Sequence, residues 1–290
     1  MKQQKSYEPR EEGILYLVPT PIGNLEDMTF RAIRTMKEAD LIAAEDTRNT
    51  SKLCNHFDID TPLFSYHEHN AYEVGPLFIE RLLRGETIAL VSDAGMPCIS
   101  DPGVHLVELA IENDISVVPL PGANAALTAL IASGLVPQPF TFYGFLPRKT
   151  KERDAALEHL SKKEETWILY EAPHRLKKTL TALQATCGGE RKIVLARELT
   201  KRFEEFLRGT IDEALTWAST ERVRGEFCLI VEGTDEVIEE EVPSWAHLTV
   251  IEHVDAILEE KDVRIKDATK EVAQLRGLKA GDVYKMYHQK

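Results

Sequence analysis

Short apolar runs alternate with amphipathic patterns through the first half of the chain. An apolar run bounded by turn residues predicts a buried strand, and apolar residues spaced three or four positions apart predict a helix that packs by one face. The predicted strands are 14–18, 41–44, 88–91 and 115–120, and the predicted helices are 29–38, 74–84 and 104–113. This alternation is typical of a parallel sheet covered by helices.

The second half of the chain has a similar pattern, with more charge on its helices. A helix rich in small residues is predicted first, at 123–133. Strands are predicted after it at 141–145, 167–170, 193–196 and 227–231, and helices at 151–163 and 175–186. We therefore expect a second α/β domain, built on a mixed sheet.

The last part of the chain is helical in pattern. Helices are predicted at 246–260, 266–276 and 280–288, and Gly277 lies in the turn between the last two. Two short helices around such a turn resemble a helix-turn-helix, which often contacts nucleic acid, although a packing or dimerisation appendage would have the same pattern. The predicted division is an N-terminal α/β domain at 13–121, a C-terminal α/β domain at 122–236, and an acidic linker with a helical tail at 237–290.

The net charge of -13 argues against a polyanionic partner when it is considered alone. The charge is segregated, however, because residues 232–260 contain ten acidic residues and no lysine or arginine. Residues 261–290 contain eight basic residues and four acidic ones. A locally basic tail is compatible with a nucleic-acid partner.

Cysteine use and hydropathy indicate a protein of a reducing compartment. Cys54, Cys98, Cys187 and Cys228 are scattered singly, a pattern that argues against a disulfide framework and against a structural zinc site. Residues 1–13 lack the apolar run of a secretory leader, and the longest apolar stretch, 125–136, is too short to cross a bilayer. We expect a cytoplasmic protein with no membrane association.

Candidate chemistry is concentrated in the loops that follow the strands of the first predicted sheet. In an open parallel sheet, ligands bind at the carboxyl ends of the strands. Four such loops, at 19–24, 45–48, 92–103 and 121–125, are charged or rich in glycine and proline. Their spacing matches neither the dinucleotide nor the P-loop fingerprint, so the residues predict a small-molecule crevice without naming the molecule.

Seven motifs run in order along the chain: VPTPIGNL at 18–25, AEDTR at 44–48, SDAGMPCISDPG at 92–103, PGANA at 121–125, FLP at 145–147, YEAPHR at 170–175 and ARELTK at 196–201. Together they resemble the signature series of the tetrapyrrole methylase superfamily, over residues 14–233. Within it they are similar to the branch that 2'-O-methylates a cytidine ribose in the decoding region of 16S ribosomal RNA. The AEDTR and YEAPHR loops are typical of that branch.

The resemblance implies two α/β domains with S-adenosylmethionine in the cleft between them, no metal, a ribosomal RNA or small-subunit substrate, and a homodimer. A ribose hydroxyl benefits from a base that takes its proton. The candidates near the predicted crevice are Glu45, Asp46, His67, Glu68, His174 and Glu198. We favour Asp46, which follows a strand directly, with Glu45 and His67 as further candidates. The positions that match the cofactor contacts are Pro21, Asp93, Gly95, Met96, Asn124, Ala125, Tyr170 and Ala196.

Basic residues near the matched motifs are candidate contacts for RNA phosphates, because RNA needs only a local basic rim. The densest group begins the second domain. The candidates are Arg48, Arg148, Lys149, Lys151, Arg175, Arg197 and Lys201.

Two other functions fit the same pattern. A uroporphyrinogen or precorrin C-methyltransferase would have a cleft lined with arginine for the carboxylates of its substrate. A non-enzymatic RNA-binding regulator would bind a ligand in the crevice without turnover.

Overall fold

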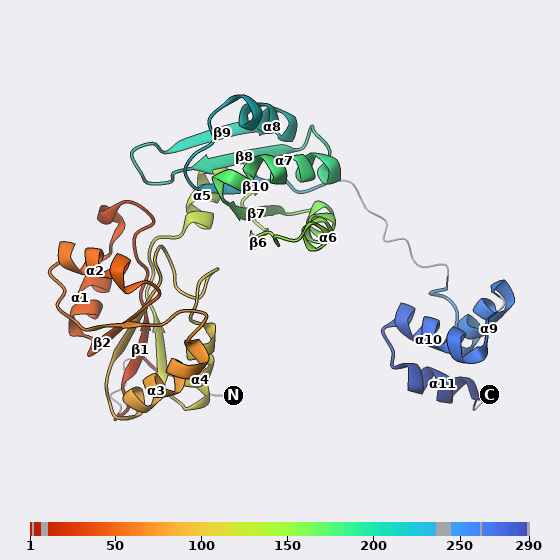
Figure 1. The fold of residues 1–290 in the computed structure, drawn as a ribbon, viewed down its shortest axis with the longest axis horizontal. Helices are drawn as coiled ribbons and strands as arrows, with labels where there is room; N and C mark the ends of the chain where they lie inside the picture. The colour runs from red at the N-terminus through yellow and green to blue at the C-terminus, as the bar shows by residue number, and fades with distance from the viewer. Residues whose placement is uncertain (2, 7–10, 236–244, 262, 289–290) are drawn as a thin grey trace. The chain divides into compact units, whose positions relative to one another are not determined.

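A computed structural model describes residues 1, 3–6, 11–235, 245–261 and 263–288. The chain forms two compact units, 1–235 and 236–290 (Figure 1). The predicted boundary between residues 121 and 122 falls inside the first unit, between its two sheets. No helix in the described part of the chain is long and apolar enough to cross a membrane.

The first sheet is parallel throughout, as the alternating pattern predicts. Its strands are β1 (Ile14–Leu17), β2 (Leu41–Ala44), β3 (Leu63–Ser65), β4 (Ile88–Val91) and β5 (Ser116–Pro119), in the order β3-β2-β4-β1-β5. Strands β2 and β4 are buried along their whole length, since helices cover both faces. Helices α3 (Ala71–Leu83) and α4 (Val104–Glu112) pack on one face, and α1 (Phe30–Glu38) and α2 (Thr47–His56) pack on the other.

The second sheet is mixed, and this confirms the second α/β fold. Its strands are β6 (Phe140–Phe145), β7 (Thr166–Glu171), β8 (Lys192–Arg197), β9 (Glu205–Thr210) and β10 (Phe227–Val231), in the order β6-β7-β10-β8-β9. Only β6 and β7 pair in parallel. Helices α6 (Thr150–Ser161), α7 (Pro173–Cys187) and α8 (Ile211–Thr220) cover one face, and α5 (Ala125–Ser133) packs on the other.

The second unit contains the three predicted C-terminal helices. These are α9 (Val250–Glu260), α10 (Ile265–Arg276) and α11 (Ala280–His288), and they share a small apolar core around Val254, Val272 and Val283. Gly277 ends α10 with a φ of 65°, a left-handed conformation that favours glycine. Residues 237–244 of the predicted acidic linker and tail, and the predicted domain end at 236, lie outside the described residues.

Candidate active site

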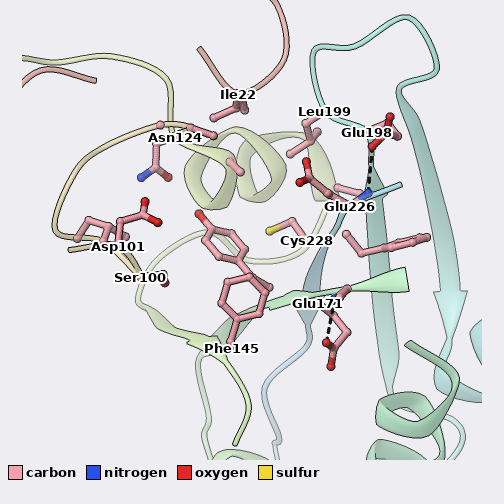
Figure 2. A pocket seen from close by; sticks show the side chains of 18 of the residues that line it. Ile22, Ser100, Asp101, Asn124, Phe145, Glu171, Glu198, Leu199, Glu226 and Cys228 are labelled. Atoms are coloured by element: carbon pink, nitrogen blue, oxygen red, sulfur yellow. Dashed lines mark hydrogen bonds between the residues drawn. The ribbon is translucent and has the colours of Figure 1, made fainter. Parts of the chain in front are cut away.

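A cavity of about 410 Å³ lies between the carboxyl edge of the first sheet and the second sheet. Ligand sites for small molecules are of this size. Figure 2 shows Asp101 and Asn124 on one side of the cavity and Glu198 and Glu226 on the opposite side. The wall is built from the loop after β4, the start of α5, and the ends of strands of the second sheet.

The loop after β4 is joined to the loop after β1 by paired backbone hydrogen bonds. The Gly95 N–H donates to the Thr20 carbonyl at 3.0 Å, and the Thr20 N–H donates to the Gly95 carbonyl at 2.9 Å. Gly95 has a φ of +82°, and a Cβ there would lie 3.3 Å from Cγ2 of Ile22. A side chain at this position would be strained and would crowd the cavity wall, so the predicted glycine loop has a structural reason.

Two non-glycine residues of this loop adopt a left-handed backbone. Cys98 has a φ of 71° and Ser100 a φ of 63°. Such conformations cost free energy, and they persist where the surroundings enforce them, often at functional sites. Here they occur in the stretch that places Ser100 and Asp101 in the cavity wall.

Asp101 is the titratable group of this loop that lines the cavity, and the sequence motifs do not single it out. Burial, together with the nearby negative charge of Glu45, raises the pKa of Asp101 to about 6. Asp101 precedes Pro102, a pair that ordinarily marks a turn. The cap of α4 is instead Gly103.

Tyr170 and Asn124 form the wall next to Asp101. The Ala126 N–H donates to Tyr170 Oη at 3.2 Å, and Asn124 Oδ1 accepts from the Leu127 N–H at 2.9 Å, which caps α5. Burial raises the pKa of Tyr170 to about 12, so its phenol is uncharged at neutral pH. The Tyr170 and Phe145 rings meet edge to face with centroids 5.6 Å apart, and they give this wall an aromatic surface.

The predicted cofactor contacts fall into two groups in the structure. Pro21 and Asp93 line a separate recess of about 350 Å³ beside α2. The Asp93 carboxylate accepts from the Asp46 N–H at 3.2 Å and from Asn49 Nδ2 at 2.9 Å, so it ties two loops together. The six that line the cavity are Gly95, Met96, Asn124, Ala125, Tyr170 and Ala196.

None of the three predicted bases is among the residues that line the cavity. Asp46 caps α2, and hydrogen bonds from Arg48, at 2.6 Å to Nη2 and 3.0 Å to Nε, lower the pKa of Asp46 to about 2. Burial raises the pKa of Glu45, whose Oε2 accepts from the Asp93 N–H at 3.3 Å. His67 lies near enough to Glu45 to interact electrostatically, and its buried Nδ1 has no hydrogen-bond partner among the described residues.

Several predicted RNA contacts are engaged within the protein. The Arg48 guanidinium pairs with Asp46. Arg175 donates to the Leu146 carbonyl at 2.8 Å, and its Nε lies 3.3 Å from a Glu171 oxygen.

Arg197 and Lys201 are held in the same way. Arg197 donates to the Arg224 carbonyl at 2.7 Å and to Glu205 at 3.0 Å. Lys201 Nζ, in the cavity wall, pairs with two carboxylates, of Glu198 at 3.0 Å and Glu226 at 2.8 Å. Of the remaining candidates, all exposed at the start of α6, Lys149 pairs with Glu152 at 3.0 Å, and the other two are Arg148 and Lys151.

Comparison with known proteins identifies the family. Residues 14–215 match the family model described as Tetrapyrrole (Corrin/Porphyrin) Methylases, so the chain belongs to this family. It is 57% identical over 290 residues, 100% of both chains, to a Halalkalibacterium halodurans protein named Ribosomal RNA small subunit methyltransferase I.

Solved structures share the fold at low sequence identity. A cobalt precorrin-4 methyltransferase is 18% identical with a TM-score of 0.59, and the match covers 78% of this chain and 98% of that one. The uroporphyrin-III C-methyltransferase of Thermus thermophilus, complexed with S-adenyl homocysteine, is 18% identical with a TM-score of 0.56, over 76% and 97% of the two chains. These likenesses confirm the predicted fold class.

Proposed function

We propose that this protein transfers a methyl group from S-adenosylmethionine to the 2'-oxygen of a cytidine ribose in the decoding region of 16S ribosomal RNA. The observation that carries the proposal is the full-length relative, 57% identical, whose name specifies methylation of small-subunit ribosomal RNA. The cavity at the carboxyl edge of the first sheet is the place where such chemistry belongs.

The residues of the cavity fit S-adenosylmethionine. The aromatic surface formed by Tyr170 and Phe145 suits an adenine ring. At Gly95 the backbone itself forms the wall, which leaves room that a Cβ would fill. S-adenosylmethionine supplies a methyl group already activated on a sulfonium, so the protein has mainly to align the ribose and exclude water.

Within this proposal Asp101, rather than Asp46, accepts the proton of the ribose hydroxyl. A general base works best when its pKa lies near the working pH. A carboxylate with a pKa of about 6 is ionised at neutral pH and still has appreciable basicity, whereas one with a pKa of about 2, held by Arg48, has little. As the ribose oxygen bonds to the methyl carbon, the carbon–sulfur bond of the sulfonium breaks and S-adenosylhomocysteine leaves, while the hydroxyl proton passes to an Asp101 carboxylate oxygen.

The lining of the cavity itself offers few unpaired cations to the carboxylates of a tetrapyrrole. Such molecules carry several carboxylates and require cations to bind them. Among the described residues that line the cavity there is no arginine, and Lys201 is already paired with Glu198 and Glu226. Asp101 and Glu171 add further negative charge.

The test is methyl transfer from labelled S-adenosylmethionine to unmodified small ribosomal subunits, free 16S RNA and uroporphyrinogen in parallel, with mapping of the labelled nucleotide. We expect label on one cytidine ribose. Label on the tetrapyrrole alone, or cofactor binding without transfer to any substrate, would refute the proposal. The homodimer and the cytoplasmic location stay predictions, and sedimentation of the purified protein checks the first.

A further inference from the structure

A second recess, of about 340 Å³, lies beside the cavity and has a different chemical character. Basic residues supply most of its lining, and no acidic residue belongs to the described lining. Its walls come from the β6–α6 connection, the first turns of α7 and the buried face of α6. The residues that line it are Pro147, Arg148, Arg153, His174, Arg175, Lys178 and Thr179.

Two of these cations are free to meet a ligand. Neither Arg148 nor Lys178 has an ion-pair partner among the residues that the structure describes, and both are exposed. Arg153 and Arg175 are neutralised by Asp154 and Glu171 respectively, so they give the recess a rigid floor rather than unpaired charge. The surplus positive charge therefore comes from Arg148 and Lys178.

The floor of the recess is built to stay in place. Arg153 is 8% exposed, and its Nε and Nη2 donate to one Asp154 oxygen at 2.9 and 2.7 Å. Glu171 is 2% exposed and accepts from Thr179 Oγ1 at 2.5 Å. Helix α7 begins here, and Glu171 Oε1 accepts from the Ala172 N–H at 2.9 Å, so this carboxylate offsets the positive end of the helix dipole.

The recess and the cavity share two stretches of chain. Phe145 lines the cavity, and Pro147 and Arg148 line the recess. Likewise residues 171–173 line the cavity, while His174 begins the recess lining on α7. Figure 2 shows Phe145 and Glu171 at the side of the cavity where these two stretches pass. The recess and the cavity thus border the same two stretches of chain, after β6 and after β7.

We infer that this recess binds a backbone phosphodiester of the RNA substrate, next to the ribose that is methylated, with Arg148 and Lys178 as its contacts. The inference rests on the proposed function and deepens it, since it assigns the anchoring of the substrate to one site. Phosphate contacts fix the register of a nucleic acid on a protein, and a lysine and an arginine in one basic hollow are suited to that role.

The test compares Lys178→Ala with Lys177→Ala, its exposed neighbour on α7 that does not line the recess. Binding to unmodified small subunits is measured over a range of salt concentrations. Loss of one phosphate contact lowers the slope of log K against log salt by about 0.7 and weakens binding about fivefold at 0.1 M salt. We expect this for Lys178→Ala and Arg148→Ala, with recovery in Lys178→Arg, and no change for Lys177→Ala.

The same variants are assayed for methyl transfer and for binding of S-adenosylmethionine. We expect a raised KM for subunits, an unchanged kcat and unchanged cofactor binding. A wild-type chain that methylates subunits, together with a Lys178→Ala variant indistinguishable from Lys177→Ala, would overturn this inference alone. A wild-type chain that transfers no methyl group to RNA would overturn the proposed function and this inference with it.

Discussion

Two aspartates near the carboxyl edge of the first sheet have opposite electrostatic surroundings. Hydrogen bonds from Arg48 stabilise the charged form of Asp46 and lower its pKa to about 2. Burial and the charge of Glu45 destabilise the charged form of Asp101 and raise its pKa to about 6. Residues of one type, both within strand-end loops, are thereby suited to different tasks: one to capping a helix, the other to accepting a proton.

The first prediction is that Asp101→Asn lowers kcat by about 100-fold to 1,000-fold, because the amide cannot accept the ribose proton. In the wild type, kcat/KM should rise with pH through about 6, the pKa of Asp101, and this limb should be absent from the variant. The measurement is a pH profile of methyl transfer to small subunits. A loss of this size in Asp46→Asn, with Asp101→Asn active, would restore Asp46 as the base.

The same carboxyl group should reduce stability at neutral pH, the second prediction. Its pKa is raised from 3.8 to about 6 on folding, so the folded protein binds more protons than the unfolded chain between those values. The free energy of unfolding therefore falls as pH rises through this window and stays lower above it. Asp101→Asn should raise the Tm at pH 7 but not at pH 3.5. The control is Asp58→Asn, an exposed residue with a φ of 53°, which asparagine also adopts.

The loops that follow the strands were predictable from the sequence. Which side chain of the 92–103 loop faces the cavity was not. Glycine and proline mark the 92–103 loop as a tight ligand-facing turn. The direction of each side chain in it depends on the left-handed backbone of Cys98 and Ser100, and nothing in the residue types predicts that conformation. The Asp101–Pro102 pair predicts only a turn, so the residue types give no sign of a proton acceptor at this position.

At the scale of elements, the turn from β7 into α7 depends on one buried carboxylate. Glu171 Oε1 accepts from the Ala172 N–H at 2.9 Å and lies 3.3 Å from Arg175 Nε, while Oε2 accepts from Thr179. The carboxylate thus joins the end of the strand to the first two turns of the helix. Both the cavity and the basic recess border this turn.

We predict that Glu171→Ala lowers the free energy of unfolding by about 3 kcal/mol, because it leaves the Arg175 charge and the Thr179 hydroxyl without their buried acceptor. Thr179→Val removes one hydrogen bond and should cost about 1 kcal/mol. Urea denaturation of the two variants checks both values. Equal losses of unfolding free energy in the two variants would mean that the ion pair between Glu171 and Arg175 contributes no stability.

Long, strongly patterned elements were predicted, and weakly patterned ones were missed. Helix α2 buries only Thr50 and Cys54, and β3 is three residues long, so neither has an apolar period to detect. Strand β9 lies at the edge of its sheet and has no fully buried residue. Helix α8 follows it directly and was missed too, although Thr210 and Glu213 form a capping box at its start.

At the scale of the whole molecule, the second unit has its own means of cohesion. Arg276 Nη2 donates to the carbonyls of Trp245 at 3.1 Å, Leu248 at 2.6 Å and Thr249 at 3.3 Å. Its guanidinium carbon lies 5.1 Å from the centroid of the Trp245 ring, within reach of a cation–π interaction. Arg276 thereby joins the end of α10 to the segment that precedes α9.

Because contacts divide the chain at residues 235 and 236, the two units should lose structure separately. We predict that Arg276→Ala destabilises the second unit by about 2 kcal/mol and leaves the first unchanged. Hydrogen exchange should speed up in α9 and α10 but not in β4 or β10. Arg276→Lys, which keeps the charge but not the planar fork, should lie between the wild type and the alanine variant.

The same variant also tests the first unit, which contains the cavity. If the units are independent, the Arg276→Ala variant should bind S-adenosylmethionine as the wild type does, since every residue of the cavity lies in the first unit. Methyl transfer to small ribosomal subunits then shows whether the second unit of this protein contributes to substrate binding. Such a contribution would appear as a raised KM with an unchanged kcat. Faster hydrogen exchange in β10 to the same extent as in α10 would show that the two units unfold together. The boundary at residue 235 would then separate contacts but not independently unfolding units.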